Sequence, residues 1–150
     1  LPVAVGLALA AKKSNSTRRI FLITGDGELA EGSNWEAALA AAHYGLDNLV
    51  IINDKNNLQL AGPTREIMNT DPLAEKWLAF GMQVTECQGN DMASVVATLE
   101  GLKQEGKPNV VIAHTTKGAG ISFIQGRAEW HHRVPKGDEI EQALKELKDA

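Results

Sequence analysis

The 150-residue sequence is poor in several residue types, and each shortage excludes a class of protein. It has one cysteine, Cys87, so no disulfide can form within the chain, and we predict a reducing, cytoplasmic setting. Aromatic residues make up 5% of the chain, too few for the stacking platforms that bind single-stranded nucleic acid. The net charge is -4, and no run of basic residues interrupts it. We therefore expect no binding to nucleic acid or to an anionic membrane.

Long apolar runs are also lacking. The apolar stretch at residues 1–11 is far shorter than the ~20 residues that span a bilayer. No basic segment precedes this stretch, so it does not fit a secretory signal peptide and instead predicts a buried helix. Because the sequence opens inside the apolar run and without a methionine, we expect that upstream sequence is missing.

Short β-rich runs alternate with longer segments of helical period. The predicted strands are residues 20–24, 48–53, 82–87 and 109–113. Three of these runs are almost continuously hydrophobic, which is typical of strands buried on both faces of a parallel sheet. Strands separated by helices require parallel crossovers. We therefore predict an α/β fold with a doubly wound, mostly parallel sheet, forming one domain or part of one.

The helix after the first strand carries the clearest start signal. Ser33 and Glu36 form a capping box, which predicts a helix from Ser33 to about His43. Its expected apolar stripe consists of Trp35, Leu39 and Ala42. Further helices are predicted from residue 71 to about 80, from residue 90 or 91 to about 104, and from 139 to 148.

Two loops at strand ends carry the polar residues that could bind a ligand. Ligands of doubly wound sheets bind beyond the carboxyl ends of the strands. There, Gly25-Asp26-Gly27-Glu28 follows the first strand, and Asp54-Lys55-Asn56-Asn57-Leu58 follows the second. One carboxylate with neutral oxygen donors suits Mg²⁺ or Ca²⁺ when an anionic ligand such as a diphosphate supplies the remaining oxygens. Both segments also occur as ordinary turns, and we expect Asp54 to be a turn former.

Other phosphate-binding motifs do not account for the chain. The sequence has no P-loop motif. Gly118-Ala119-Gly120 lacks the third glycine at the required spacing, and no clear helix follows it. A nicotinamide-binding domain is therefore not predicted.

The two loops at the strand ends resemble those of a known family. Gly25-Asp26-Gly27, followed thirty residues after Asp26 by Asn56, resembles the signature of thiamine diphosphate enzymes. Residues 25–62 closely resemble the diphosphate-binding domain of transketolases, and 115–120 (TTKGAG) and Trp130-His131 resemble its later motifs, in the same order. The resemblance covers nearly the whole chain, residues 1–150, and about the second half of that domain. It favours the N-terminal subunit of a split transketolase, lacking its upstream part.

The resemblance also implies roles for particular residues. Asp26 and Asn56 would ligate the metal through their side chains, and Leu58 through its backbone carbonyl. The residues that match the family's cofactor contacts are Gly25, Gly27, Asn56, Lys117 and His131. His131 and Glu31 match residues of the catalytic centre. The family usually has glycine after the Trp-His pair, where this chain has His132, which makes donor specificity an open question.

Activity and partners follow from the same resemblance. With thiamine diphosphate and Mg²⁺ (or Ca²⁺), a transketolase transfers a two-carbon ketol unit from a ketose phosphate to an aldose phosphate, as in the pentose phosphate pathway. The glutamate that engages the aminopyrimidine lies in a separate domain of the family. We therefore expect a partner, the pyrimidine-domain (C-terminal) subunit, in a hetero- or homo-oligomer.

Two alternatives remain. The chain could be a non-catalytic interaction subunit of the transketolase type. It could also be a receiver-like switch module that is phosphorylated on Asp54, with Lys117 after a later strand. Such modules need an acidic pair after the first strand, whereas Asp26 has glycine on both sides.

Overall fold

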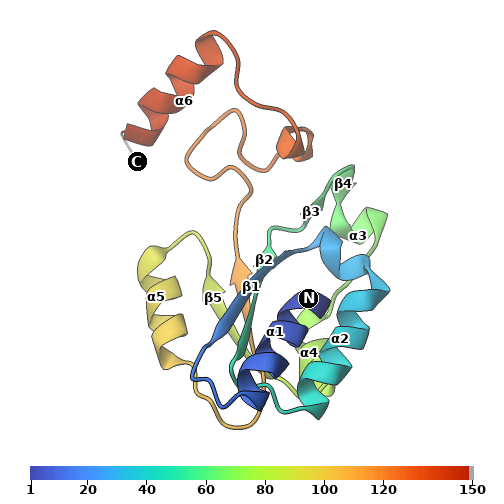
Figure 1. Cartoon of the computed structure of the whole chain (residues 1–150). Helices are drawn as coiled ribbons and strands as arrows, with labels where there is room; N and C mark the ends of the chain where they lie inside the picture. The colour runs from blue at the N-terminus through green and yellow to red at the C-terminus, as the bar shows by residue number, and fades with distance from the viewer. Residues whose placement is uncertain (149–150) are drawn as a thin grey trace.

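A parallel four-stranded sheet forms the centre of the molecule (Figure 1). The computed structural model describes residues 1–148. The strands are β1 (Ile20–Gly25), β2 (Leu49–Lys55), β5 (Gln83–Gln88) and β6 (Asn109–His114). They lie in the order β1-β2-β6-β5, and all three neighbouring pairs are parallel. All four lie where the sequence predicts them, and the α/β fold with a parallel sheet is confirmed.

Helices cover both faces of this sheet (Figure 1). On one face lie α1 (Pro2–Lys13), α2 (Gly32–His43) and α4 (Leu73–Ala79), and on the other lies α5 (Met92–Gly101). The larger core lies on the first face and includes the fully buried Trp77, whose ring centroid is 4.8 Å from that of Trp35. The smaller core, under α5, includes the buried Cys87.

The sequence predicts the start and the buried face of α2 incorrectly. The helix begins at Gly32, with Glu31 as its N-cap residue and no side-chain capping bond, so Ser33 is not the cap. A 3₁₀ turn, η1 (Gly27–Ala30), leads directly into the helix, and the Asn34 side chain stabilises this turn by donating to the Glu28 carbonyl at 2.6 Å. The buried face consists of Asn34, Ala37, Ala38 and Ala41, whereas Leu39 is 60% exposed.

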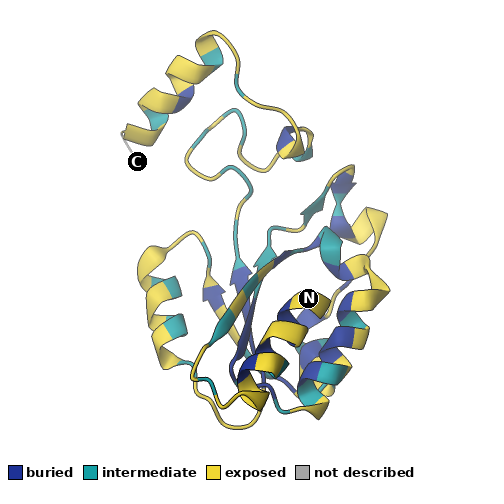
Figure 2. Cartoon of the chain, viewed as in Figure 1, coloured by how far each residue is buried: buried dark blue, intermediate teal, exposed yellow. Residues whose placement is uncertain are grey.

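Helix α1 also differs from its prediction. Its inward face consists of the small side chains Ala4, Val5, Ala8 and Ala11, and residues on the opposite face are exposed, among them Val3 at 78%. The helix is therefore half-buried rather than buried all round, as Figure 2 shows. Within residues 1–148, no helix combines the length and the apolar composition needed to cross a membrane.

Several short elements gather beyond the carboxyl ends of the strands (Figure 1). They are the hairpin β3 (Leu58–Gln59) and β4 (Gly62–Pro63), α3 (Thr64–Ile67), the 3₁₀ turn η2 (Ala128–His131) and α6 (Asp138–Lys148). Hydrogen bonds hold helix α6 against the loop after β6. The N–H and the hydroxyl of Ser122, on the loop, both donate to the carboxylate of Glu146, on α6. Hydrogen bonds from Gln142 and Ser122 lower the pKa of Glu146. These elements lie beyond the end of the sheet where the sequence places the two polar loops, and α6 stands farthest from the sheet (Figure 1).

Candidate cofactor-binding site

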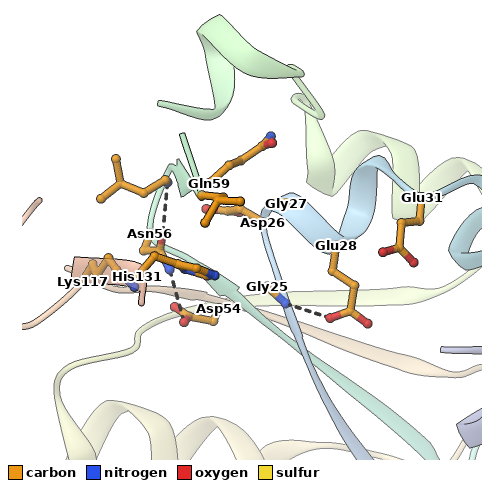
Figure 3. Close-up of a pocket in the computed structure, with 12 residues that line it drawn as sticks. Gly25, Asp26, Gly27, Glu28, Glu31, Asp54, Asn56, Gln59, Lys117 and His131 are labelled. Atoms are coloured by element: carbon orange, nitrogen blue, oxygen red, sulfur yellow. Dashed lines mark hydrogen bonds between the residues drawn. The ribbon is translucent and has the colours of Figure 1, made fainter. Parts of the chain in front are cut away.

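A cavity of about 490 Å³ lies at the carboxyl ends of β1 and β2 (Figure 3). Its volume is in the range of small-molecule sites. Every site residue expected from the sequence lines it: Gly25, Asp26, Gly27, Glu31, Asn56, Leu58, Lys117 and His131. Four further residues, which are outside the expected cofactor, metal and catalytic sets, line the cavity too: Glu28, Asp54, Gln59 and Leu60. The fold therefore brings together residues that are up to about a hundred positions apart in the chain.

Asp26 connects the two loops that form the floor of the cavity. Its side chain is buried, at 2% exposure, and its Oδ2 accepts the backbone N–H of Asn57 at 2.5 Å. Asn57 has a φ of 61°, in the left-handed region that asparagine tolerates better than most residues. Burial raises the pKa of the Asp26 carboxyl, while the Asn57 N–H and the positive charge of Lys55 act in the opposite direction. A buried carboxylate of this kind favours a nearby cation.

Asn56 is held at both ends of its side-chain amide. Its Oδ1 accepts the backbone N–H of Leu58 at 3.0 Å, and its Nδ2 donates to Asp54 Oδ2 at 3.3 Å. The other oxygen of Asp54 accepts the hydroxyl of Thr115, the residue that follows β6. Asp54 lies within β2, so it is not the turn former that the sequence predicts. Because donors engage both of its oxygens, Asp54 also does not resemble a free phosphoacceptor.

Lys117 and His131 reach the cavity from the segment after β6. Lys117 lies in a loop that closes on itself, since the Gly126 N–H donates to the Lys117 carbonyl at 2.9 Å. His131 ends η2, next to the buried Trp130, and its ring is 4.6 Å from that of His132. His132 is not one of the residues that line the cavity. The substitution for the family's usual glycine therefore adds a second imidazole beside the site rather than inside it.

The two glutamates of η1 and α2 complete the lining. Glu28 Oε2 accepts the backbone N–H of Gly25 at 3.3 Å, as the dashed line in Figure 3 shows. Glu31 lines the cavity as an exposed residue of the chain at the start of α2. Together with Asp26 and Asp54, they make the cavity more acidic than basic. A multivalent anion alone would be repelled from it, so an anionic ligand needs a cation to accompany it.

The donor set fits a divalent cation that also carries a diphosphate. A carboxylate, an amide oxygen and a backbone carbonyl are the hard ligands that Mg²⁺ and Ca²⁺ prefer. Among residues 1–148, no group of three or more His, Cys, Asp or Glu side chains is placed to hold a metal ion. A diphosphate would supply the missing oxygens. A Cβ at Gly25 would meet no atom within 4 Å, so the chain leaves space for a ligand there.

Comparison with known proteins identifies relatives of this chain. Residues 6–148 match the family described as transketolase, thiamine diphosphate binding domain. The chain is 74% identical over 149 residues to one subunit of the apulose-4-phosphate transketolase of Actinobacillus succinogenes, covering 99% of this chain and 54% of that protein. It is 38% identical over 145 residues to the 6-deoxy-6-sulfo-D-fructose transketolase subunit SqwG of a Clostridium species, covering 96% and 53%.

A solved structure shows the same fold. The crystal structure of transketolase from Campylobacter jejuni matches with a TM-score of 0.89 and 31% sequence identity, covering 97% of this chain and 24% of that one. The chain spans about half the length of the curated relatives it matches. The family match includes the three segments on which the resemblance rests, which are residues 25–62, 115–120 and 130–131. The chain belongs to the transketolase family, and its residues 6–148 match the family's thiamine diphosphate-binding domain.

Proposed function

We propose that this chain is part of the N-terminal subunit of a split transketolase, corresponding to the C-terminal portion of the diphosphate-binding domain. In complex with a pyrimidine-domain subunit, it binds thiamine diphosphate through Mg²⁺ and takes part in transfer of a two-carbon ketol unit from a ketose phosphate to an aldose phosphate. The observation that carries this proposal is the meeting of Asp26, Asn56 and Leu58 at one cavity. The names of two relatives, each described as a transketolase subunit, support the split form.

Different residues of the cavity are assigned to the metal and to the cofactor. The Asp26 carboxylate, Asn56 Oδ1 and the Leu58 carbonyl would hold the Mg²⁺, and Ca²⁺ would accept the same donors. Gly27 and Asn56 would contact the diphosphate, and Gly25, Lys117 and His131 would complete the contacts to the cofactor. Thiamine diphosphate supplies, when bound, the carbanion stabilisation that cleavage of a carbon–carbon bond requires.

The chain contributes proton handling and charge. His131 is exposed at the cavity and can donate a hydrogen bond to a developing oxyanion or move a proton. The Lys117 ammonium complements the phosphate charge. Glu31 lies where the cavity is open to solvent, so its carboxylate is available to a partner that closes this side.

The partner surface lies beside the cavity. Leu60 lines the cavity and is 59% exposed, and Ile67 and Met68 on the neighbouring short helix and loop are 48% and 56% exposed. Of these three residues only Leu60 lines the cavity, while the Met68 carbonyl accepts a hydrogen bond from Gln59, which also lines it. Exposed apolar side chains next to a site are typical of a protein interface. The pyrimidine-domain subunit would cover them and complete the site. Among ketose phosphates, apulose 4-phosphate is favoured as the donor by the name of the relative with 74% identity.

Reconstitution of transfer tests this function. The chain is mixed with a separately purified pyrimidine-domain subunit, thiamine diphosphate, Mg²⁺, apulose 4-phosphate as donor and an aldose phosphate as acceptor, and the new ketose phosphate is quantified. We expect turnover that falls by about a hundredfold in His131→Ala, within the usual range for loss of a general acid or base. His43→Ala, at the exposed end of α2, is the matched control and keeps full activity. Binding of the partner without any transfer would instead indicate an interaction subunit.

A further inference from the structure

We propose that Asp54 and Thr115 fix the orientation of the Asn56 side chain, which makes Asp54 a positioning residue for the metal. This inference deepens the proposed function and rests on it. Asp54 lines the same cavity as Asn56, but it is outside the expected set of metal ligands. Its role follows from what its two carboxylate oxygens contact.

The two ends of an asparagine amide have nearly the same shape, but only the oxygen end can bind a cation. An ionised carboxylate accepts hydrogen bonds and cannot donate them. Asp54 Oδ2 lies 3.3 Å from the Asn56 amide, so the nitrogen end must face Asp54 (Figure 3). The oxygen end is thereby directed to the other side, where it accepts the N–H of Leu58 at 3.0 Å.

A flipped amide would be disfavoured at both ends. Its oxygen would face the Asp54 carboxylate, and its NH₂ group would face the Leu58 N–H and the metal position. Leu58 is the residue whose carbonyl is the third expected ligand. Only one orientation of the Asn56 amide therefore forms a hydrogen bond at both ends. Asp54 provides one of these two bonds, and the Leu58 N–H provides the other.

Asp54 is itself held in place by the neighbouring strand. Its Oδ1 accepts the Thr115 hydroxyl, and the Thr115 N–H donates to the Lys55 carbonyl at 3.1 Å. In the sheet, Asp54 pairs with Gly25 of β1 and with Ala113 of β6. Its carboxylate is thus carried by the carboxyl end of an inner strand that is paired on both sides, and not by a free loop. The result is a chain of hydrogen bonds from Thr115 through Asp54 to Asn56.

Three variants and one control test this chain of contacts by the apparent Mg²⁺ affinity, measured calorimetrically at a fixed concentration of thiamine diphosphate. Asp54→Asn keeps the shape but can present NH₂ to Asn56, and Thr115→Val removes the hydroxyl. We expect each to weaken Mg²⁺ binding about tenfold or more, as is usual for outer contacts of metal ligands. Thr115→Ser keeps the donor and should restore the affinity.

The control is Glu86→Gln. Glu86 contacts His114 at 2.5 Å and lies on β5 at the same edge of the sheet, so this variant removes an equal charge without touching Asn56. It should keep the Mg²⁺ affinity within about twofold. Equal weakening in Glu86→Gln and Asp54→Asn would show a general charge effect and overturn the positioning role.

A second measurement separates this inference from the proposed function. In the chain without ligand, the side-chain NH₂ resonances of Asn56 report the bond to Asp54, and we expect them to shift in Asp54→Asn and to remain in place in Glu86→Gln. Suppose that the unmodified chain binds Mg²⁺ and thiamine diphosphate, and that Asp54→Asn and Thr115→Val bind Mg²⁺ as tightly as the unmodified chain does. The positioning role would then be wrong, and the proposed function would stand. If the chain mixed with the pyrimidine-domain subunit binds neither ligand, the proposed function fails. Unshifted Asn56 resonances in Asp54→Asn would exclude the contact whatever the outcome of the binding measurement.

Discussion

The Asp26 carboxylate accepts the backbone N–H of Asn57 across 2.5 Å, which joins the loop after β1 directly to the loop after β2. The two residues are 31 positions apart in the chain. In the proposed function, Asp26 and Asn56 hold the same metal ion. The relative positions of the two loops are therefore set before any ligand enters, which lowers the cost of ordering them on binding.

The Leu58 side chain should be dispensable for metal binding, because its expected donor is the backbone carbonyl. We predict that Leu58→Ala changes the apparent Mg²⁺ affinity by less than about threefold, whereas Asn56→Ala, which removes a donor atom, lowers it by more than about tenfold. Calorimetric titration of Mg²⁺ in the presence of thiamine diphosphate gives both values. A large loss in Leu58→Ala with no loss in Asn56→Ala would reverse the assignment.

The stability of the ligand-free chain should depend on the charge of Asp26. Because its folded pKa is raised, the ionised carboxylate destabilises the folded chain above that pKa, and the cost fades as the pH falls through it. We therefore predict that Asp26→Asn melts at a higher temperature than the unmodified chain at neutral pH, and that this gain shrinks toward about pH 4.

Thermal unfolding at several pH values, without Mg²⁺, measures this gain. Asp91→Asn is the matched control, since Asp91 is the exposed N-cap residue of α5 and asparagine caps helices equally well. It should show no comparable gain. A lower melting temperature for Asp26→Asn at neutral pH would mean that the carboxylate stabilises the fold through its bond to Asn57.

Gly118 sets the shape of the loop that carries Lys117. Its φ is 67°, and a Cβ added there would lie 2.4 Å from Ile124 Cγ2. We predict that Gly118→Ala lowers the free energy of unfolding by about 1–3 kcal/mol, the usual cost of a residue held in the left-handed region. Gly32→Ala, where the added Cβ meets no atom within 4 Å, should be neutral or stabilising. Urea denaturation distinguishes the two, and equal stability would contradict the account of this loop.

The sequence predicts the sheet, and the meeting of the two polar loops at one end of it, because both depend on local patterns. Continuous hydrophobic runs indicate buried parallel strands, and the parallel arrangement brings their carboxyl ends to one edge. Asp26 and Asn56 could therefore be placed together from the sequence. Leu58 could be placed with them only through the family resemblance, since a leucine side chain gives no sign that its carbonyl binds a metal.

The parts that the sequence misses depend on contacts distant in the chain. Aspartate is common in turns, so the sequence predicts Asp54 to be a turn former. Its hydrogen-bond partner Thr115 is 61 positions away in the chain, and no local pattern indicates this contact. The start of α2 depends on the Asn34 side chain reaching back to the η1 turn, which competes with the local capping box at Ser33. In both cases a side-chain hydrogen bond set by the fold overrides a local preference.

The most direct measurement is a calorimetric titration of thiamine diphosphate into this chain with and without Mg²⁺, repeated on Asp26→Ala. We predict binding that requires Mg²⁺ and is lost in the variant, because the buried Asp26 carboxylate is the charged metal ligand of the proposed site. Binding that is indifferent to both Mg²⁺ and Asp26 would contradict it.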